Sequence, residues 1–447
     1  MKKYIILLFF LSFVLLSFGQ QGFRLNIEKP LHIPFKFINN LIFIPMQVNG
    51  VELTFMLDSG IDETILFSLE NKEVQFNNVK KVKLKGLGSA NEIDGMISQG
   101  NKVNIGKHLI DTLHKIIIIL NEDFNFSSHI GIPINGIIGY QFFKNYPVRI
   151  NFENRKIYIY PNESKKYKRL IKKREPYNIS IEKNRPYMQA VINMNTQKVD
   201  SKLLIDLGNS DGIWLFSKEL KDFIYPLPNF DDYLGRGFNG DIYGKRSKVE
   251  GIYIDKYYLK RPFVAIPNDA SITSLELVEN RKGSIGTEIF KRFNIILDYP
   301  NHKIYFDKNT LFEEEFKYNM AGIDLKYDGT EWAEESFLVV DFQTTKATNP
   351  QKDDNKINEI PVNKMRYKFV LKPIYSVAGV RNNSPASEAD IRKGDVLQKV
   401  NGHPASKYKL EDLNNLFVSK ENKEVSFELK RGTEIIKKTI ILKDPLK

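Results

Sequence analysis

Two aspartates occupy matching places in two halves of the sequence. One begins the tripeptide Asp58-Ser59-Gly60 and the other begins Asp206-Leu207-Gly208, and each tripeptide follows a short apolar run. Gly139 lies 81 residues after the first aspartate, and Gly286 lies 80 residues after the second. A duplication of this kind could bring two carboxyl groups together across a pseudo-twofold axis. Two such groups can share one proton and activate a water molecule.

The elements that must position these aspartates are β-strands. Leu41–Val48 and Val51–Leu57 are strand-like runs joined by Asn49-Gly50, which is a strong signal for a two-residue hairpin turn. Residues 148–160 predict a second hairpin. The same order of elements recurs in the second half, so the sequence predicts two homologous lobes at 23–160 and 177–312. Short helices are expected at 140–145 and 287–292.

The first of these motifs continues as Asp58-Ser59-Gly60-Ile61-Asp62 and resembles the loop of pepsin-like and retropepsin-like aspartic peptidases. The resemblance covers roughly residues 23–306. It implies a bilobal pair of acid-protease β-barrels in which Asp58 and Asp206 activate a water that hydrolyses a peptide bond, without a cofactor or a covalent intermediate. The residues that would support the two catalytic loops are Ser59, Gly60, Gly208, Gly139 and Gly286.

Leu207 departs from this family pattern. The family usually has Thr or Ser at this position, and the hydroxyl group ties the two aspartate loops together. A leucine side chain cannot donate or accept a hydrogen bond. Two classes of function therefore stay open, an active endopeptidase and a binding protein that kept the lobed fold but lost the chemistry.

The resemblance also implies a flap between each aspartate and its later glycine. In the first lobe the candidate is the stretch containing Gly86 and Gly88, with an ordinary turn as the alternative. In the second lobe the counterpart is residues 235–240. Its GxGxxG spacing does not indicate a dinucleotide site, because no crossover helix pattern follows. Trp214 could line the cleft or pack in the core.

The C-terminal part has a different character. Ser384-Pro385-Ala386, Lys393-Gly394-Asp395 and Asn401-Gly402 resemble the signature of PDZ domains in exported bacterial proteases. We therefore expect an α+β PDZ domain at 317–447, with a polar insertion of little structure near 346–364.

PDZ domains bind an extended peptide as an added strand. The resemblance implies Gly322, Ile323 and Leu325 as peptide-binding residues. The alternatives are a domain that only packs on the lobes and an adaptor that tethers the chain to an envelope partner.

Composition and charge exclude several classes of functional site. The 447 residues include no cysteine, which excludes thiolate nucleophiles, thiolate metal sites and disulfides, and the length suggests about three domains. Much of the net charge of +12 lies in a basic linker at 161–176. No aromatic interleaving accompanies that charge, so it is not expected to bind nucleic acid. The six histidines form no metal-ligand pattern, and we predict no metal site.

The N-terminus resembles a targeting segment. Lys2 and Lys3 precede an apolar stretch that is short for a membrane span, and Gly19 is a small residue at a plausible cleavage point. Residues 1–19 are therefore predicted to be a signal peptide that exports the chain to the periplasm or the extracellular space. The alternative is an uncleaved anchor.

The expected partners are peptide or protein substrates. Because both lobes lie in one chain, the aspartate pair does not require a dimer.

Overall fold

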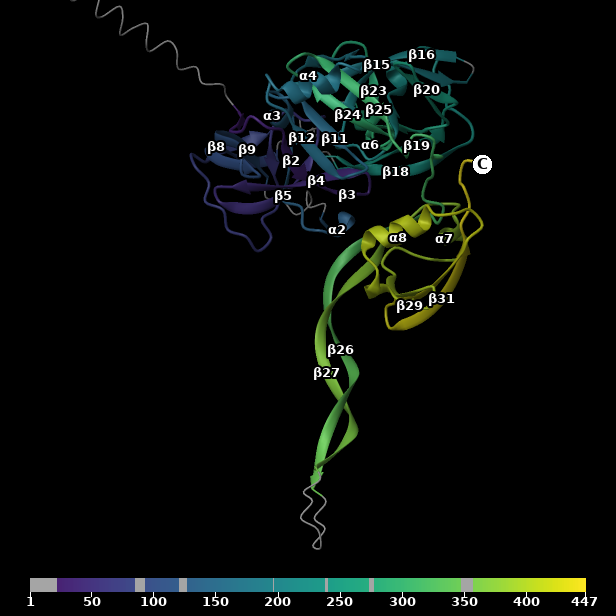
Figure 1. The fold of residues 1–447 in the computed structure, drawn as a ribbon. Helices are drawn as coiled ribbons and strands as arrows, with labels where there is room; N and C mark the ends of the chain where they lie inside the picture. Colours follow the sequence, from purple (N-terminus) through teal and green to yellow (C-terminus); the bar gives the residue numbers. More distant parts are fainter. Residues whose placement is uncertain are drawn as a thin grey trace, which may run out of the picture.

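The computed structural model describes residues 22–84, 93–119, 127–195, 197–237, 240–272, 277–346 and 357–447. The predicted signal peptide and the predicted flap glycines Gly86 and Gly88 lie outside these residues. The described strands form four sheets. Figure 1 shows two lobes side by side, with a C-terminal unit beneath them from which a long two-stranded ribbon projects.

The N-terminal lobe is built on a nine-stranded sheet. The hairpin expected from Asn49-Gly50 is present, with strands at the predicted bounds. Strand β10 runs parallel to β5, and β6 runs antiparallel to β10. The elements of this lobe are β1 (Arg24–Leu25), β3 (Lys36–Ile38), β4 (Leu41–Val48), β5 (Val51–Leu57), β6 (Ile65–Leu66), β7 (Lys80–Leu84), β8 (Ile93–Ile105), β9 (Leu109–Ile118), α2 (Ser127–Ile130), β10 (Gly136–Ile138) and α3 (Tyr140–Phe143).

The C-terminal lobe repeats this arrangement in a ten-stranded sheet. Strand β23 runs parallel to β16, and β17 runs antiparallel to β23, as β10 and β6 do in the first lobe. The elements are β14 (Ser180–Glu182), β15 (Arg185–Met194), β16 (Gln197–Asp206), β17 (Ile213–Leu215), η2 (Ser217–Glu219), β18 (Asn229–Gly237), β19 (Gly240–Lys248), β20 (Gly251–Ile254), β21 (Tyr257–Lys260), β22 (Phe263–Pro267), α5 (Asp269–Ile272), β23 (Arg281–Gly286) and α6 (Thr287–Phe290).

A six-stranded sheet joins the two lobes. Strand β11 of the first lobe pairs antiparallel with β24 of the second, so that Val148 lies opposite Leu297. The strands are β2 (Leu31–Pro34), β11 (Val148–Asn151), β12 (Lys156–Ile159), β13 (Tyr177–Asn178), β24 (Phe293–Asp298) and β25 (Lys303–Lys308). Apolar side chains of both lobes and of this sheet form one continuous core.

The basic segment between the lobes contains a short helix, α4 (Lys165–Ile171). The Ser164 side chain caps this helix by accepting a hydrogen bond from the backbone N–H of Tyr167 at 3.3 Å. The Tyr167 hydroxyl in turn donates to the Asp298 carboxylate on the joining sheet. Lys165, Lys166, Lys168 and Arg169 are exposed, so the helix packs by one face and keeps its charge in solvent.

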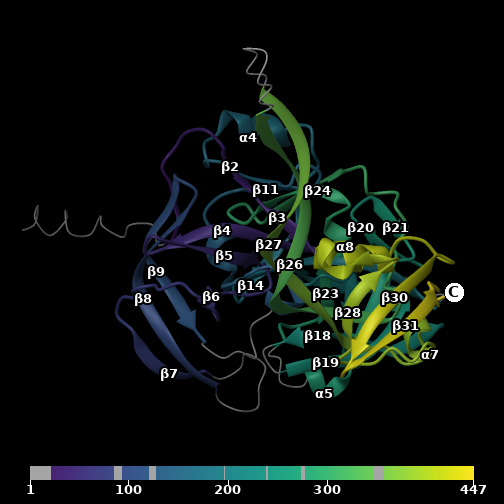
Figure 2. The ribbon, with the colours of Figure 1, turned by 90° about the horizontal axis from the view of Figure 1, so that it is seen from below.

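The C-terminal unit has its own apolar core. Its elements are β26 (Ile323–Lys346), β27 (Ile357–Val380), α7 (Pro385–Glu388), β28 (Val396–Val400), β29 (His403–Pro404), η3 (Ala405–Lys407), α8 (Leu410–Phe417), β30 (Glu424–Arg431) and β31 (Glu434–Ile441). Helix α8 packs beside β26, as Figure 2 shows.

One expectation about this unit is wrong. Residues 357–364 of the polar insertion are not unstructured, because they belong to β27 and pair with the outer half of β26.

Candidate active site

The first aspartate lies directly after β5 and is buried. Its backbone N–H donates to the Ile138 carbonyl of β10 at 3.0 Å, which fixes the start of the loop. Its carboxylate accepts a hydrogen bond from the Gly60 N–H at 2.7 Å. The parallel strand β10 thus anchors the loop, and the turn at Gly60 orients the carboxylate of Asp58.

The second aspartate ends β16, where it lies opposite Gly286 of the parallel strand β23. It meets the first one across the lobes. A β-carbon added to Gly60 would lie 2.9 Å from Asp206 Oδ1 and 3.1 Å from Asp58 Oδ1. One added to Gly208 would lie 2.3 Å from the Asp58 carboxyl carbon. Both carboxyl groups therefore lie against the same pair of glycines and interact with each other.

Ser59 links the two loops. Its hydroxyl donates to the Ile205 carbonyl at 2.6 Å and accepts from the Leu207 N–H at 3.0 Å. Leu207 itself is fully buried in the apolar core. Its carbonyl accepts from the Thr287 hydroxyl at 3.1 Å. One hydroxyl from each lobe therefore holds the second loop, although the tripeptide of that loop carries none.

The two later glycines support these loops by close backbone approach. A β-carbon on Gly139 would lie 2.2 Å from the Ile61 carbonyl oxygen, and one on Gly286 would lie 2.2 Å from the Asp211 carbonyl oxygen. Neither distance is possible for a real side chain. Helices α3 and α6 begin directly after these glycines, as the sequence predicts, although each helix ends two residues earlier than expected.

The surroundings raise the pKa of both carboxyl groups. For Asp58 the causes are burial, then the negative charge of Asp206 and the hydrogen bond to it. For Asp206 the main cause is burial, which the positive charges of Arg281 and Arg185 partly offset. Two carboxyl groups that lie against the same pair of glycines cannot both carry a negative charge easily. The pair therefore titrates as a unit and retains a proton above the usual range for carboxyl groups.

Sequence analysis missed the two arginines near the pair. Arg185 begins β15 and lies 3.8 Å from the Asp62 carboxylate of the other lobe. Arg281 begins β23 and is buried beside the rings of Phe216 and Tyr187. Both lie far from the aspartate motifs in sequence, and each is an ordinary charged residue in a strand. Only the pairing of β15 and β23 with β16 brings them to the site.

A charged network connects the second aspartate loop to the C-terminal unit. Asp211 pairs with Arg246 at 2.7 Å, and Arg246 pairs with Asp232 at 2.7 Å. The Tyr318 hydroxyl also donates to Asp232. The guanidinium carbon of Arg381 lies 5.7 Å from the centre of the Tyr318 ring. Arg381 directly follows β27 and lies next to the loop before β26.

The residues expected to bind peptide lie at the start of β26. Gly322 has a φ of +74°, and a β-carbon there would lie 2.3 Å from the Ser384 side chain. Ile323 and Leu325 are 2% and 4% exposed, respectively. They pack in the core of the C-terminal unit.

Helix α2 of the N-terminal lobe lies against β26 (Figure 1). A β-carbon on Gly131, directly after α2, would lie 2.9 Å from the side chain of Leu410 at the start of α8. The segment around α2 thus lies against both β26 and the start of α8 of the C-terminal unit.

Two other predicted positions have different surroundings. Trp214 is half-buried on β17, and its indole N–H donates to the Asp211 carboxylate at 2.7 Å. It is not a member of the apolar core. Residues 235–240 lie at the tip of the β18–β19 hairpin, of which residues 238 and 239 are outside the described part.

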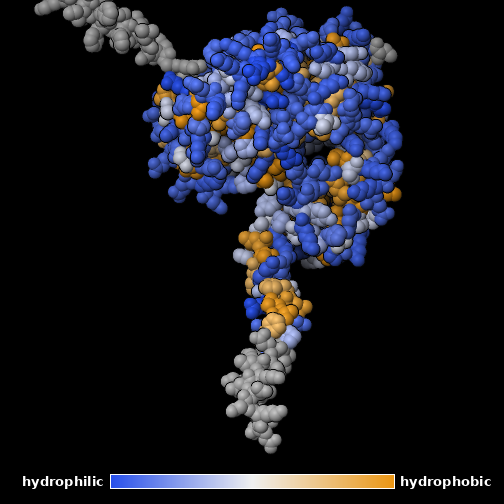
Figure 3. Space-filling model, in the orientation of Figure 1, coloured by the Kyte–Doolittle hydropathy of each residue, from blue (hydrophilic) through white to orange (hydrophobic). Residues whose placement is uncertain are grey.

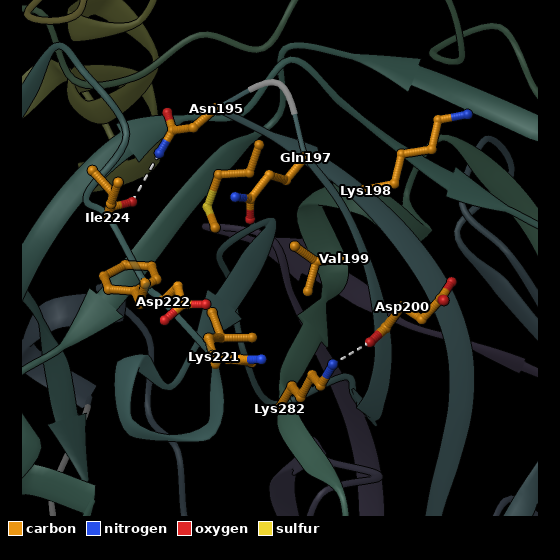
Figure 4. Close-up of a pocket in the computed structure, with 12 residues that line it drawn as sticks. Asn195, Gln197, Lys198, Val199, Asp200, Lys221, Asp222, Ile224 and Lys282 are labelled. Carbon is orange, nitrogen blue, oxygen red and sulfur yellow. Dashed lines mark hydrogen bonds between the residues drawn. The ribbon is translucent and has the colours of Figure 1, made fainter.

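A cavity of about 320 Å³ lies in the C-terminal lobe, away from the aspartates (Figure 4). The end of the β15–β16 hairpin forms one wall, and the loop at 220–224 forms the other. The Asn195 amide donates to the Ile224 carbonyl at 2.8 Å across it. Asp200 borders the cavity, and Asp206 lies six residues further along β16, about 20 Å away at strand spacing. This cavity is therefore separate from the carboxyl pair.

Comparisons with known proteins support the predicted C-terminal domain. The family model for the PDZ domain matches residues 348–442. A solved structure, an aspartic proteinase from Irpex lacteus, resembles the chain with 9% sequence identity and a TM-score of 0.41, covering 64% of this chain and 99% of that one. No curated protein matches the sequence.

The chain is therefore mainly β, with a PDZ domain at its C-terminus, and the predicted fold class is confirmed. Within the described ranges, no cluster of three or more His, Asp or Glu side chains could hold a metal ion. None of the helices in that same part of the chain is long and apolar enough to cross a membrane.

Proposed function

We propose that this protein is an exported aspartic endopeptidase whose PDZ domain binds substrate or partner peptides. The observation that carries the proposal is the meeting of Asp58 and Asp206, contributed by equivalent loops of two lobes. Elevated pKa values favour a pair that holds one proton at working pH. The ionised carboxylate would take a proton from a water molecule, and the protonated one would donate to the oxygen of the scissile carbonyl.

The surroundings of the pair suit this chemistry. Gly60 and Gly208 leave the carboxyl groups free of neighbouring side chains on the faces where the loops meet. The Gly60 N–H stabilises one carboxylate oxygen, and Arg185 and Arg281 limit the rise in pKa that burial would cause. A fully protonated pair would have no base, so this balance favours the singly protonated state.

The test is hydrolysis of a peptide library by the full chain, read by mass spectrometry. Asp58→Asn and Asp206→Asn should each abolish cleavage while the chain stays folded, and a statine-type inhibitor should block the wild type. The matched control is Asp200→Asn, which changes an exposed carboxylate on the same strand as Asp206 and should keep full activity. Cleavage that survives both dyad substitutions would overturn the proposal.

A folded wild type that cleaves nothing but binds peptide would instead support a binding protein on the same scaffold. The loop geometry does not favour that outcome. The hydroxyl of Ser59 still joins the two loops despite the leucine at position 207. Export rests on the predicted signal peptide, and detection of the mature chain outside the cytoplasm would test it.

A further inference from the structure

Beyond the PDZ sheet, β26 and β27 continue as an isolated ribbon. Residues 330–346 pair with 357–373, and no other described strand pairs with this part. The ribbon leaves the domain at a bulge that contains Gly329, whose φ is +92°. Figure 1 shows the ribbon extending away from the lobes. A two-stranded ribbon alone is only marginally stable in water. The side chains on its two faces indicate whether another molecule covers either face.

One face of the ribbon is apolar. Side chains directly opposite in an antiparallel pair share a face, and so do residues two apart on one strand. Trp332 lies opposite Leu371, and Leu338 lies opposite Met365. This apolar face carries eight large side chains, each 51–71% exposed: Trp332, Leu338, Val340, Phe342, Met365, Tyr367, Phe369 and Leu371. Figure 3 shows hydrophobic residues gathered on the projecting ribbon.

The other face carries apolar side chains such as Phe337, Val339 and Val370 together with charged side chains, and these charges pair with one another. Glu335 pairs with Lys368 at 3.0 Å and with Lys372 at 3.1 Å. Asp341 pairs with Lys364 at 3.1 Å and lies 3.9 Å from Arg366. These groups suit contact with water. The contrast between the two faces indicates that only the apolar face is built to be covered.

We propose that the apolar face is the contact surface between two copies of this chain. Eight side chains with roughly 100 Å² exposed on each would bury about 800 Å² per copy, which is the size of a standard protein interface. A twofold axis would place the same apolar patch on both partners, and sheets pack face to face readily in this way.

The charges of the ribbon favour a second copy over an anionic lipid surface. Binding to lipid headgroups gains from unpaired cations at the rim of the apolar surface. Lys364, Lys368 and Lys372 each pair with a carboxylate of the same ribbon and lie on the opposite face. Among the described side chains of the apolar face, Glu334 is charged, and it lies opposite Phe369. Its negative charge would oppose contact with anionic lipid.

The test is the mass of the full chain by sedimentation velocity over a range of concentrations. The wild type should form a dimer. Leu338→Glu should raise the dissociation constant of that dimer at least tenfold. The neighbouring Phe337→Glu is the matched control, because Phe337 is 43% exposed but lies on the charged face. It should leave the dimer intact. Circular dichroism checks that both variants keep the fold.

The chain contains no cysteine, so one introduced thiol reports on one site. Maleimide should react more slowly with Ser336→Cys, on the apolar face, as concentration rises, whereas Phe337→Cys should react at a constant rate. A wild type that stays monomeric at all concentrations would overturn the proposal. So would equal dissociation by Leu338→Glu and Phe337→Glu, or a monomer that sediments with anionic vesicles through the apolar face.

Discussion

The two aspartate loops lie on equivalent strands but are held in different ways. In each lobe a long strand ends at the aspartate, and a parallel strand beside it ends at the supporting glycine. The first loop supplies a hydroxyl, Ser59, that bonds both a carbonyl and an amide of the second loop. The second loop places Leu207 in the core instead, and Thr287 of its own lobe bonds its carbonyl.

This difference shows that a symmetric pair of hydroxyl groups is not the only way to join two such loops. The departure at position 207 removes one possible link, but the remaining hydroxyl makes two hydrogen bonds. The loop with the leucine gains apolar packing and a bond within its own lobe. Each feature can be removed separately, so the contribution of each loop can be measured.

The largest effect is expected where the loops are closest. In Gly208→Ala the new methyl group would lie 2.3 Å from the Asp58 carboxyl carbon and must displace that side chain. A shift of about 1 Å in a catalytic group can reduce the rate about 100-fold, and we expect at least that loss in kcat. Gly60→Ala should cost less, because its nearest atom is Asp206 Oδ1 at 2.9 Å. Steady-state kinetics on both variants checks the order, and a milder effect at Gly208 would contradict it.

Loss of the Ser59 hydroxyl should come next. Ser59→Ala leaves the Leu207 N–H and the Ile205 carbonyl without their partner in a fully buried place, and each unmet group costs about 1–3 kcal/mol. We expect both lower stability and lower kcat, measured by denaturant unfolding and peptide hydrolysis. Ser59→Thr keeps the hydroxyl and is the control. Equal losses in Ser59→Ala and Ser59→Thr would mean that volume, not the hydrogen bonds, decides the effect.

Much of this site could be predicted from sequence because its parts are local. Short-range sequence patterns predict the apolar strand before Asp58, the Asn49-Gly50 turn and the later glycine. The same patterns occur again in the second half of the chain, which strengthens the prediction. Arg185 and Arg281 could not be found in this way, because strand pairing across the sheet brings them to the aspartates. Thr287 was missed for the same reason, since it bonds a residue 80 positions earlier.

The projecting ribbon was missed for a different reason. The polar composition of residues 346–364 suggested a segment with little structure, and the length of the strands on either side was not predicted. The signal was a period of two in β27, in which Met365, Tyr367 and Phe369 alternate with Lys364, Arg366 and Lys368. Alternation of this kind predicts a strand with one apolar face even where the overall composition is polar.

The carboxyl pair should make stability depend on pH. Its raised pKa values mean that the folded chain binds more protons than the unfolded chain, in which each carboxyl has a pKa near 3.8. Stability from the protonated pair is therefore complete below that value and is lost as pH rises through the folded pKa values. Asp58→Asn removes this loss, so the variant should be more stable than the wild type near neutral pH.

Thermal unfolding at several pH values measures this effect. The melting temperature of Asp58→Asn should exceed that of the wild type by roughly 2–4 °C for each kcal/mol gained at neutral pH. The difference should vanish as pH falls toward the unfolded pKa. Asp200→Asn, at an exposed position, should show no such pH-dependent gap. A gap for Asp58→Asn that is equal or larger in acid would contradict the pKa directions.

The smallest effect is expected from restoring a hydroxyl at position 207. Leu207→Thr removes buried apolar volume, which destabilises, but the pseudo-twofold would place the new hydroxyl near the backbone of the first loop, which stabilises by about 1 kcal/mol. Leu207→Val loses similar volume and adds no hydroxyl, so the difference between the two variants isolates the hydrogen bond. We expect Leu207→Thr to exceed Leu207→Val in unfolding free energy by about 1 kcal/mol, with kcat changed only a few-fold. A gain in kcat of tenfold or more would show that the link through Ser59 alone holds the loops too loosely for full activity.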